Sequence, residues 1–428
     1  MTNRASKPLG FWPVLALVVG NMVGSGIYLL PATLAPFGTN ATLGWMATIA
    51  GAMCLAFIFA RLAHAMPVAG GPYAFVNAAF GPVAGFATAW SYWTLLWAGN
   101  AAVAIAVISA ISLILPGLEA YAALASLVLI WSVVLVNVRG VALAGRVQLV
   151  TAALKLVPLV GVILLALWLL TTQGGEAIVP NPAVPITGGA IAGAAALTFW
   201  GFLGVESATV PADRITNAAR VVPFATILGT FLTGAVYLAV SLALTTMMPA
   251  AEAAASPSPI ATFLGRTFGN GTAVVVAAFA AIAALGALNG FTLLQGEICA
   301  AMARGGVFPA WLGKQSSRGT PARAHIVSGV LVTVVTLTNY TRGMGDLFTF
   351  IASVSLAAGM LAYFASACAA IKLLPGDRPA VIVAAIGAAF VAWLSWGLGA
   401  EANAWALILL LAGAPVYLLV RRAAASGR

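Results

Sequence analysis

The sequence predicts an all-α integral membrane protein with twelve transmembrane helices, built as two inverted five-helix repeats (5+5) plus two C-terminal helices. The 428 residues are 62% hydrophobic and only 7% charged, with a mean hydropathy of +1.07. A soluble domain carries roughly a quarter charged residues, so this composition excludes a soluble protein. Many apolar runs also reach the length that crosses a bilayer, about 20 residues. Two of these runs are interrupted by glycines at matching positions of the two halves.

The apolar runs are continuous and rich in Leu, Ala, Val and Gly, which favours helices over the alternating strands of a membrane β-barrel. We treat residues 1–428 as one transmembrane domain, with the first repeat over 11–170, the second over 190–371 and two peripheral helices over 380–420. The predicted spans are Phe11–Ala35, Thr42–Arg61, Val83–Leu115, Tyr121–Val138, Val147–Leu170, Ala190–Val210, Val222–Met247, Thr272–Met302, Ala324–Tyr340, Leu347–Ile371, Ala380–Leu398 and Ala402–Val420.

The basic residues predict the orientation of these spans. With a cytoplasmic N-terminus, all of the 19 Lys and Arg residues except Arg266, Arg342 and Lys155 fall on the cytoplasmic side. This is the distribution that the positive-inside rule requires, so we expect a multi-pass protein of the inner membrane with both termini in the cytoplasm. The net charge of +10 is thereby explained by orientation and by contact with anionic lipid, and nucleic acid is not expected as a partner.

The two glycine-rich interruptions predict broken helices. The first span contains Gly20-Asn-Met-Val-Gly-Ser-Gly26 and the sixth contains Gly201-Phe-Leu-Gly-Val-Glu-Ser207. Broken helices at corresponding positions of two repeats are typical of secondary transporters, where the breaks form the substrate site. The alternative is that the glycines only allow close packing of helices.

A broken helix leaves backbone groups free at membrane depth, and these predict the kind of ligand. The N–H groups of Ser25, Gly26 and Ile27 would begin the outer half-helix and suit a carboxylate. The carbonyls near Met22, together with those of the sixth span, could accept from an ammonium group. A carboxylate site that faces ammonium acceptors fits the backbone of an amino acid.

Several motifs resemble those of the amino acid–polyamine–organocation permeases, in particular the bacterial arginine/agmatine and polyamine antiporter branch. They occur in the family's order across most of the chain: the 20–27 segment followed by Leu30-Pro31, Pro67-Val-Ala-Gly-Gly-Pro-Tyr73, Phe80-Gly81-Pro82, Phe199-Trp-Gly-Phe-Leu-Gly-Val-Glu-Ser207 and Arg304-Gly-Gly-Val-Phe-Pro309. The resemblance implies alternating access around a central site and sometimes a homodimer.

The resemblance also implies a substrate site, in which Trp200 would close over the substrate as an aromatic gate. The alternative for Trp200 is an ordinary core aromatic. Phe291 falls where the arginine transporter has a tryptophan, and it offers a weaker cation–π face. The substrate-binding residues expected on this basis are Asn21, Met22, Gly24, Ser25, Gly26, Ile27, Leu96, Asn100, Val103, Trp200, Leu203, Phe291 and Ser353.

Two ionisable residues lie within predicted spans, where charge is costly and usually functional. Glu206 is a candidate for proton coupling or for sensing substrate charge, and its alternative is a structural carboxylate that ties down the broken helix. Lys155 resembles a fifth-helix lysine that stands where sodium-coupled relatives bind sodium, which implies sodium independence. The arginine/agmatine branch usually lacks this lysine, and its alternative is snorkelling to the interface.

Three further residues are expected near the gates. Glu297 could pair with Arg304 or Arg61 as a cytoplasmic gate, or could be a solvated interfacial acid. Tyr73 and Tyr92 match family positions near the gates.

The predicted function is exchange of a cationic amino acid for its amine. The alternative is a sodium-independent, proton-coupled symporter or uniporter for neutral amino acids, favoured by Phe291 and Lys155. An enzyme would need a nucleophile–base or metal cluster, and a channel would need a continuous polar lining. The sequence suggests neither. The expected partners are a small amino acid or amine, membrane lipid and, as a candidate co-substrate, protons; no metal or cofactor is expected.

Overall fold

The computed structural model describes residues 9–24, 26–256, 258–269, 271–338 and 344–425, and these residues form helices joined by short turns. The α-helices in chain order are α1 (Phe11–Met22), α2 (Gly26–Leu34), α3 (Thr39–Ala65), α4 (Pro72–Phe80), α5 (Pro82–Ser112), α6 (Ala122–Arg139), α7 (Val141–Gln173), α8 (Gly188–Phe199), α9 (Ala218–Met247), α10 (Ala250–Ala255), α11 (Pro259–Phe268), α12 (Thr272–Arg304), α13 (Ala322–Thr338), α14 (Met344–Leu373), α15 (Arg378–Gly397), α16 (Gly399–Leu411) and α17 (Ala414–Ala425).

Ten helices in the described part of the chain are long and apolar enough to cross a membrane, so this is a multi-pass membrane protein. They coincide with ten of the predicted spans. The first predicted span is divided between α1 and α2, and the ninth coincides with the shorter α13, although its predicted end at Tyr340 lies outside the described residues. The count of twelve and the inverted repeat therefore stay predictions.

The predicted break in the first span is confirmed. Helix α1 ends at Met22, and Val23 leaves the helical region with a ψ of 83° before α2 begins at Gly26. Glycine costs roughly 1 kcal/mol in a helix relative to alanine, so the glycines around this point weaken continuous helix. Ser25, which lies between the two half-helices, is outside the described residues.

The predicted break in the sixth span is also confirmed. Helix α8 ends at Phe199, and two short 3₁₀ turns follow, η4 (Trp200–Phe202) and η5 (Ser207–Thr209). Between them Gly204 has a φ of +106°, which an L side chain rarely adopts. Helix α1 packs against both η4 and η5, so the two breaks lie next to each other.

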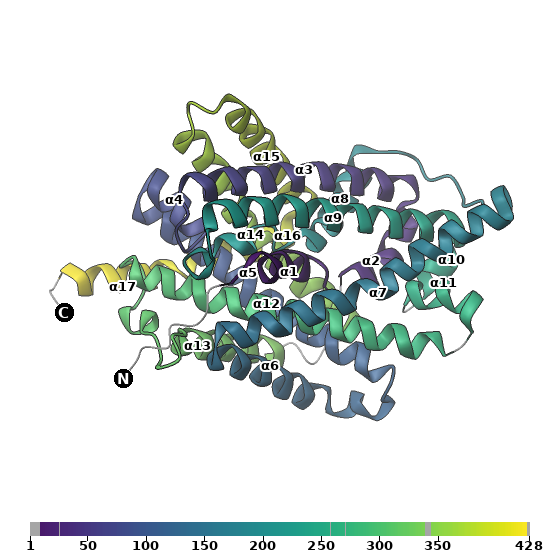
Figure 1. Cartoon of the computed structure of the whole chain (residues 1–428), viewed down its shortest axis with the longest axis horizontal. Helices are drawn as coiled ribbons and strands as arrows, with labels where there is room; N and C mark the ends of the chain where they lie inside the picture. The colour runs from purple at the N-terminus through teal and green to yellow at the C-terminus, as the bar shows by residue number, and fades with distance from the viewer. Residues whose placement is uncertain (1–8, 25, 257, 270, 339–343, 426–428) are drawn as a thin grey trace.

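The break region is surrounded by long helices (Figure 1). Helices α3, α8 and α9 pack side by side, while α5 packs against α12 and α14. The apolar stretch of Pro82–Ser112 is 78% buried, whereas that of the C-terminal Gly399–Arg422 is only 11% buried. Helix α5 is therefore a central element, and α16 and α17 are peripheral.

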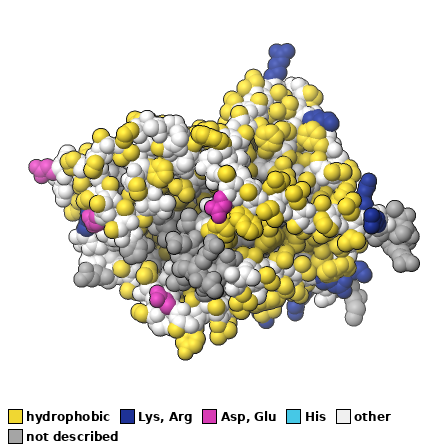
Figure 2. Space-filling view, turned by 180° about the vertical axis from the view of Figure 1, so that it is seen from behind, with side chains coloured by type: hydrophobic (Ala, Val, Ile, Leu, Met, Phe, Trp, Pro, Cys, Tyr) yellow, Lys and Arg dark blue, Asp and Glu magenta, His cyan; other side chains and the backbone are white. Residues whose placement is uncertain are grey.

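Charge is distributed unequally between the two ends of the bundle. In Figure 2 the Lys and Arg side chains gather at the right-hand end, which is the end of α4 and α17 in Figure 1, and the acidic side chains visible on this face lie away from it. Large apolar side chains are exposed between the ends, for example Leu164 and Leu167 on α7, each more than half exposed. An apolar belt between a basic end and a less basic end suits a bilayer.

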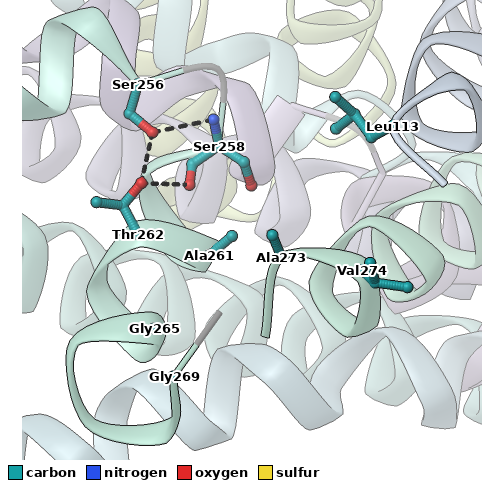
Figure 3. Close-up of a pocket in the computed structure, with 9 residues that line it drawn as sticks. All are labelled: Leu113, Ser256, Ser258, Ala261, Thr262, Gly265, Gly269, Ala273 and Val274. Atoms are coloured by element: carbon teal, nitrogen blue, oxygen red, sulfur yellow. Dashed lines mark hydrogen bonds between the residues drawn. The ribbon is translucent and has the colours of Figure 1, made fainter. Parts of the chain in front are cut away.

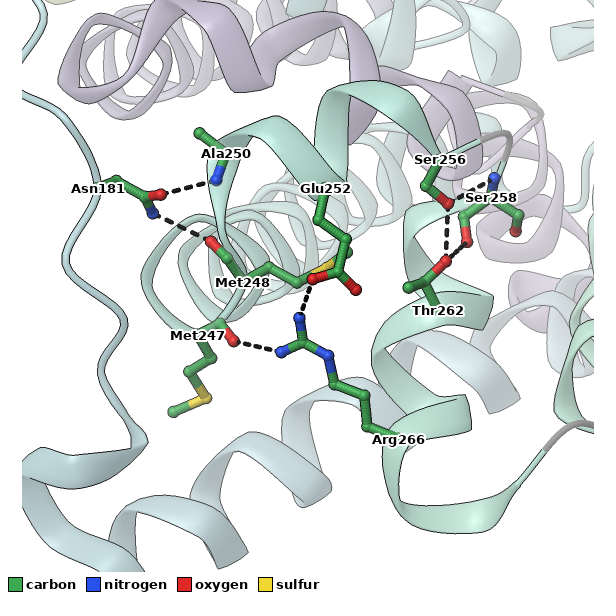
Figure 4. Close-up of polar contacts among 9 residues, drawn as sticks. All are labelled: Asn181, Met247, Met248, Ala250, Glu252, Ser256, Ser258, Thr262 and Arg266. Carbon is green, nitrogen blue, oxygen red and sulfur yellow. Dashed lines mark hydrogen bonds and ion pairs between the residues drawn. The ribbon is translucent and has the colours of Figure 1, made fainter.

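The opposite end of the bundle carries two short helices that the sequence analysis did not anticipate, α10 and α11 (Figure 1). Arg266 on α11 joins these helices to the end of α9: it donates to the Met247 carbonyl at 2.9 Å and pairs with Glu252 of α10 at 2.5 Å (Figure 4). Asn181 bonds to the start of α10, donating to Met248 O at 3.0 Å and accepting from the N–H of Ala250.

The last predicted span, Ala402–Val420, differs from the observed structure in one respect. It is divided between α16 and α17 at Ala412-Gly413. Gly413 has no room for a side chain, since a Cβ there would lie 2.7 Å from the Trp90 ring.

Candidate functional site

Trp200 occupies the space between the first break and the central helix α5. A Cβ added at Gly26 would lie 2.9 Å from Trp200 Cδ1, and one added at Gly99 would lie 3.6 Å from its Cη2. The indole therefore rests on two glycines, one at the start of α2 and one on α5. The tryptophan expected to act as a gate is in contact with both walls of the expected substrate site.

Asn100 follows Gly99 and extends the site towards α12. Its Nδ2 donates to Gln295 Oε1 at 3.0 Å and to Thr292 Oγ1 at 3.4 Å. Its Oδ1 is buried and accepts no hydrogen bond from any described residue. A buried acceptor without a donor is rare and costly, so this oxygen is available to a ligand.

The other predicted contact residues lie around the same helices. Phe291 precedes Thr292 on α12 and is 6% exposed. Ser353 is half-buried on α14 near Ser355, whose hydroxyl donates to Leu95 O at 2.7 Å. Ile27, Leu96, Val103 and Leu203 are buried in the same apolar core. Gly24 faces α12, because a Cβ there would lie 3.2 Å from the Cβ of Ala287.

The Met22 carbonyl differs from the expectation that it would be free for an ammonium group. It accepts from the hydroxyl of Tyr237 on α9 at 2.7 Å and from the N–H of Gly24 at 2.9 Å. Both acceptor positions of this carbonyl are therefore occupied in this conformation. Asn21, the preceding residue, bonds to the second break by donating to Ser207 Oγ at 2.7 Å.

Glu206 lies in the second break and is held by two tyrosines. Tyr92 on α5 donates to its Oε1 at 2.6 Å, and Tyr363 on α14 donates to its Oε2 at 2.7 Å. All three side chains are fully buried. The carboxylate thus joins the second break to two long central helices, and each of its oxygens has a donor.

Comparisons of the chain with known proteins show its family. The model of the amino acid permease family matches residues 9–416. The chain belongs to this family. Its relatives include the cadaverine/lysine antiporter of Escherichia coli, 36% identical over 369 residues that cover 85% of this chain and 83% of the relative. They also include the arginine/ornithine antiporter of Pseudomonas aeruginosa, 28% identical over 97% of this chain and 92% of the relative. The putrescine transporter of Haemophilus influenzae is 25% identical over 97% of both chains.

The permease is thus a member of the amino acid–polyamine–organocation superfamily, in its antiporter branch, as the motifs predicted. The alignments extend over most of the chain, including both breaks and the helices around them. These relatives are transporters, which agrees with the expectation that the chain is not an enzyme.

Lys155 of the permease does not reach the membrane interface. It is fully buried on α7, and its Nζ donates to the carbonyl of Gly20 at 2.6 Å, just before the first break. The Lys155 carbonyl in turn accepts from the hydroxyl of Tyr28 on α2 at 2.8 Å. The residue contacts both half-helices of the first span, so the snorkelling alternative does not describe this conformation.

For Glu297 the solvated-acid alternative and the pairing with Arg61 were wrong, whereas Arg304 does interact electrostatically with the carboxylate. The carboxylate is 1% exposed, so it is not a solvated acid. Its ion pair is to Arg214, at 3.9 Å, and Arg61 instead pairs with Asp377. The pairing was not visible in the sequence because Arg214 lies in a short turn after the second break, η6 (Ala212–Arg214), far along the chain from Glu297.

Tyr73 lies at the basic end of the permease, in the first turn of α4. A Cβ at Gly305 would come within 1.8 Å of its hydroxyl oxygen. Burial raises the pKa of the Tyr73 hydroxyl above its ordinary range, so this group stays protonated at neutral pH. The contact between Tyr73 and Gly305, at the end of α12, involves no charged group. A position of Tyr73 near the gate stays a prediction.

Two cavities lie outside the predicted site. One of about 380 Å³ opens at the α10–α11 end, where Ser256, Ser258 and Thr262 bond to one another (Figure 3). Another of about 270 Å³ is an apolar groove between α1, α7 and α9. None of the residues that line either cavity is among the predicted substrate contacts.

The sequence analysis missed several buried polar residues near the breaks. They are Tyr237, Tyr363, Gln148, Asn289, Asn137, Gln295 and Ser207. All but Ser207 are single polar residues in an apolar run or next to a glycine, a pattern that also fits a satisfied core residue. Only the hydrogen bonds that the structure shows between them distinguish these residues from ordinary core residues.

Proposed function

We propose that this permease exchanges a cationic amino acid for its amine across the inner membrane by alternating access, with arginine/agmatine or lysine/cadaverine as the pair. The supporting observation is the contact of Trp200 with Gly26 and Gly99, which joins the first break, the second break and α5 around one indole. The relatives named as antiporters of lysine with cadaverine and of arginine with ornithine support the same class of substrate.

The substrate backbone would bind at the two breaks. The N–H groups of Gly26 and Ile27 begin α2, where the partial positive charge of a helix N-terminus favours the carboxylate. The ammonium group would take the carbonyls of Trp200 and Leu203, since the Met22 carbonyl already has two donors. An amine without a carboxylate would then bind more weakly at α2, which lets it leave after exchange.

The substrate side chain would extend between α5 and α12. The unpaired Asn100 Oδ1 can accept from a guanidinium or a terminal ammonium group. Phe291 on α12 offers apolar contact to the methylene stem of the substrate and a weak cation–π face. Together these contacts recognise a cation without an acidic side chain.

Glu206 would link binding to the movement of the helices. Its oxygens hold Tyr92 of α5 and Tyr363 of α14 against the second break. Movement of the second break away from α5 and α14 would have to separate at least one tyrosine from the carboxylate. The carboxylate could then take up a proton or respond to substrate charge. Twelve spans, cytoplasmic termini and a homodimer remain parts of this proposal.

A second candidate function is sodium-independent, proton-coupled transport of a neutral amino acid. The observation that favours it is the bond from Lys155 Nζ to Gly20 O, because a buried lysine at the first break can release a proton as the ammonium and take one up as the amine. Phe291 favours it as well, because a phenyl ring is a poorer partner for a cation than an indole.

A binding screen with the purified permease separates these functions. A ligand that binds the native state raises the unfolding temperature by mass action, so the common amino acids and amines can be compared directly. Stabilisation by arginine, agmatine, lysine or cadaverine supports exchange of cations. Stabilisation confined to neutral amino acids supports the second candidate and rejects the first.

A further inference from the structure

A chain of buried amide side chains runs from the two breaks to the helices behind them. Asn21 Nδ2 donates to Ser207 Oγ at 2.7 Å, and Gln148 Nε2 donates to Asn21 Oδ1 at 3.2 Å. Asn289 Nδ2 donates to Gln148 Oε1 at 3.3 Å, and Asn137 Nδ2 donates to Asn289 Oδ1 at 3.2 Å. We call this series the amide chain; it connects both breaks to α7, α12 and α6.

The amide chain has one direction. Each of the four amides donates towards the breaks, and Asn21, Gln148 and Asn289 each accept from the amide behind them. Hydrogen bonds in series polarise one another in a low-dielectric interior, so such a chain acts as a unit. A change at Gln148, its central residue, interrupts the connection on both sides.

The two amides farthest from the breaks are anchored on the backbone of the supporting helices. Asn289 Nδ2 also donates to Ala144 O of α7 at 3.0 Å, and Asn137 Nδ2 donates to Val133 O of α6 at 3.0 Å. The amides are at most 2% exposed, and the Nδ2 or Nε2 group of each has an acceptor in a region where an unpaired amide is expensive.

Two glycines make room for the chain. A Cβ at Gly290 of α12 would lie 1.7 Å from Asn21 Oδ1, and one at Gly20 of α1 would lie 2.2 Å from Gln148 Nε2. Any larger residue at either position would displace an amide. The close approach of α1, α7 and α12 is therefore matched to these side chains.

We propose that the amide chain is a positioning device that holds the two breaks against α6, α7 and α12, and that Gln148 thereby sets substrate affinity without touching the substrate. This inference rests on the proposed function for its binding readout. The breaks lack continuous helical hydrogen bonding, and a site that is ordered before binding spares the ligand the cost of ordering it. Without the amide chain, substrate binding would have to supply the free energy that orders the two breaks, and affinity would fall.

The test uses two substitutions at Gln148 in the full-length purified permease. Gln148→Met keeps the approximate volume but removes all three hydrogen bonds of this side chain, which include one from Nε2 to Ala16 O at 3.5 Å. Gln148→Glu keeps the acceptor for Asn289 and removes the N–H groups donated to Asn21 and Ala16. For Gln148→Met we expect Kd, measured for the ligand that most stabilises the wild type, to rise by about tenfold, which corresponds to about 1.4 kcal/mol. We expect Gln148→Glu to weaken binding in the same direction, because it interrupts the same link to the first break.

A matched control separates positioning from general stability. Asn181→Ala removes a side chain that also makes three bonds, to Thr245 O, Met248 O and the N–H of Ala250, but at the α10–α11 end (Figure 4). This variant should lose stability and keep the wild-type Kd. An equal Kd in Gln148→Met and the wild type overturns the proposal.

A readout without substrate makes the result independent of the proposed function. Amide hydrogen exchange in the segment 16–24 should be faster in Gln148→Met than in the wild type, because the end of α1 loses its hydrogen bonds to Gln148 of α7 and keeps the one from Lys155 to Gly20 O. Unchanged exchange in this segment overturns the proposal even if no cationic ligand is found. If Gln148→Met fails to fold, Ser207→Ala is used instead, because it removes only the bond between Asn21 and Ser207. A weaker Kd and faster exchange in residues 16–24 then support the proposal, and unchanged values overturn it.

Discussion

The two tyrosines that hold Glu206 give a prediction whose size follows from the structure. Tyr92→Phe and Tyr363→Phe each remove one hydroxyl from a fully buried carboxylate, with O···O distances of 2.6 and 2.7 Å. A hydrogen bond to a charged group contributes about 1.5–3 kcal/mol, against about 0.5–1.5 kcal/mol for a neutral one. If the carboxylate is ionised here, each substitution should lower the free energy of unfolding by the larger amount.

Tyr237→Phe is the matched control. Tyr237 is equally buried, and its hydroxyl donates at 2.7 Å to a neutral acceptor, the Met22 carbonyl. Charge-assisted hydrogen bonds are roughly twice as strong as neutral ones, so the control should lose about half as much stability as the other two variants. The double variant of Tyr92 and Tyr363 should lose more than both single losses together, because it leaves a buried charge without either of its side-chain donors.

The assay is unfolding by a denaturing detergent in mixed micelles, followed by tryptophan fluorescence in the absence of substrate. Equal losses in all three single variants would mean that Glu206 is neutral in this conformation. Losses below about 0.3 kcal/mol for Tyr92→Phe and Tyr363→Phe, well under the contribution of even a neutral hydrogen bond, would refute the idea that the carboxylate clamps the second break.

Four further substitutions test other parts of the account. Glu206→Gln should flatten the pH dependence of exchange by the reconstituted permease, since an amide does not titrate; an unchanged profile rejects a proton role. Lys155→Met leaves Gly20 O without its donor, which should cost about 1–3 kcal/mol in unfolding and slow exchange, and wild-type values for both would assign the ammonium no role. Phe291→Trp should tighten binding of a cationic substrate by about 2- to 30-fold in a titration, with no gain for a neutral one. Glu252→Gln weakens a pair whose side chains are 38% and 40% exposed, so unfolding should change by less than about 1 kcal/mol and exchange should not change.

Composition and glycine spacing were sufficient to predict the long apolar helices and both breaks. A long apolar run must form a helix in a bilayer, and a cluster such as Gly201 to Gly204 cannot sustain one. The short helices α10 and α11 were missed because their sequence has no apolar run long enough to separate them from a loop. The division of the last span at Gly413 was missed because one glycine in an apolar run does not specify a bend.

The candidate site could be predicted only where residues lie in a motif. Gly26, Trp200 and Glu206 belong to recognisable segments, and the structure brings the first two together. The partners of Glu206 and Glu297 could not be predicted, because Tyr363 and Arg214 come from distant segments and contact depends on packing. The amide chain escaped prediction for the same reason, since its hydrogen bonds to Asn21 and Gln148 join residues far apart in sequence.

Counterflow in proteoliposomes tests the proposed exchange most directly. The purified permease is reconstituted in vesicles loaded with agmatine or cadaverine, and uptake of labelled arginine or lysine is measured without a proton gradient. The account predicts rapid uptake that depends on the internal amine and is absent from empty vesicles. Equal uptake into empty vesicles, or uptake that requires an imposed proton gradient, would contradict exchange and favour the proton-coupled alternative.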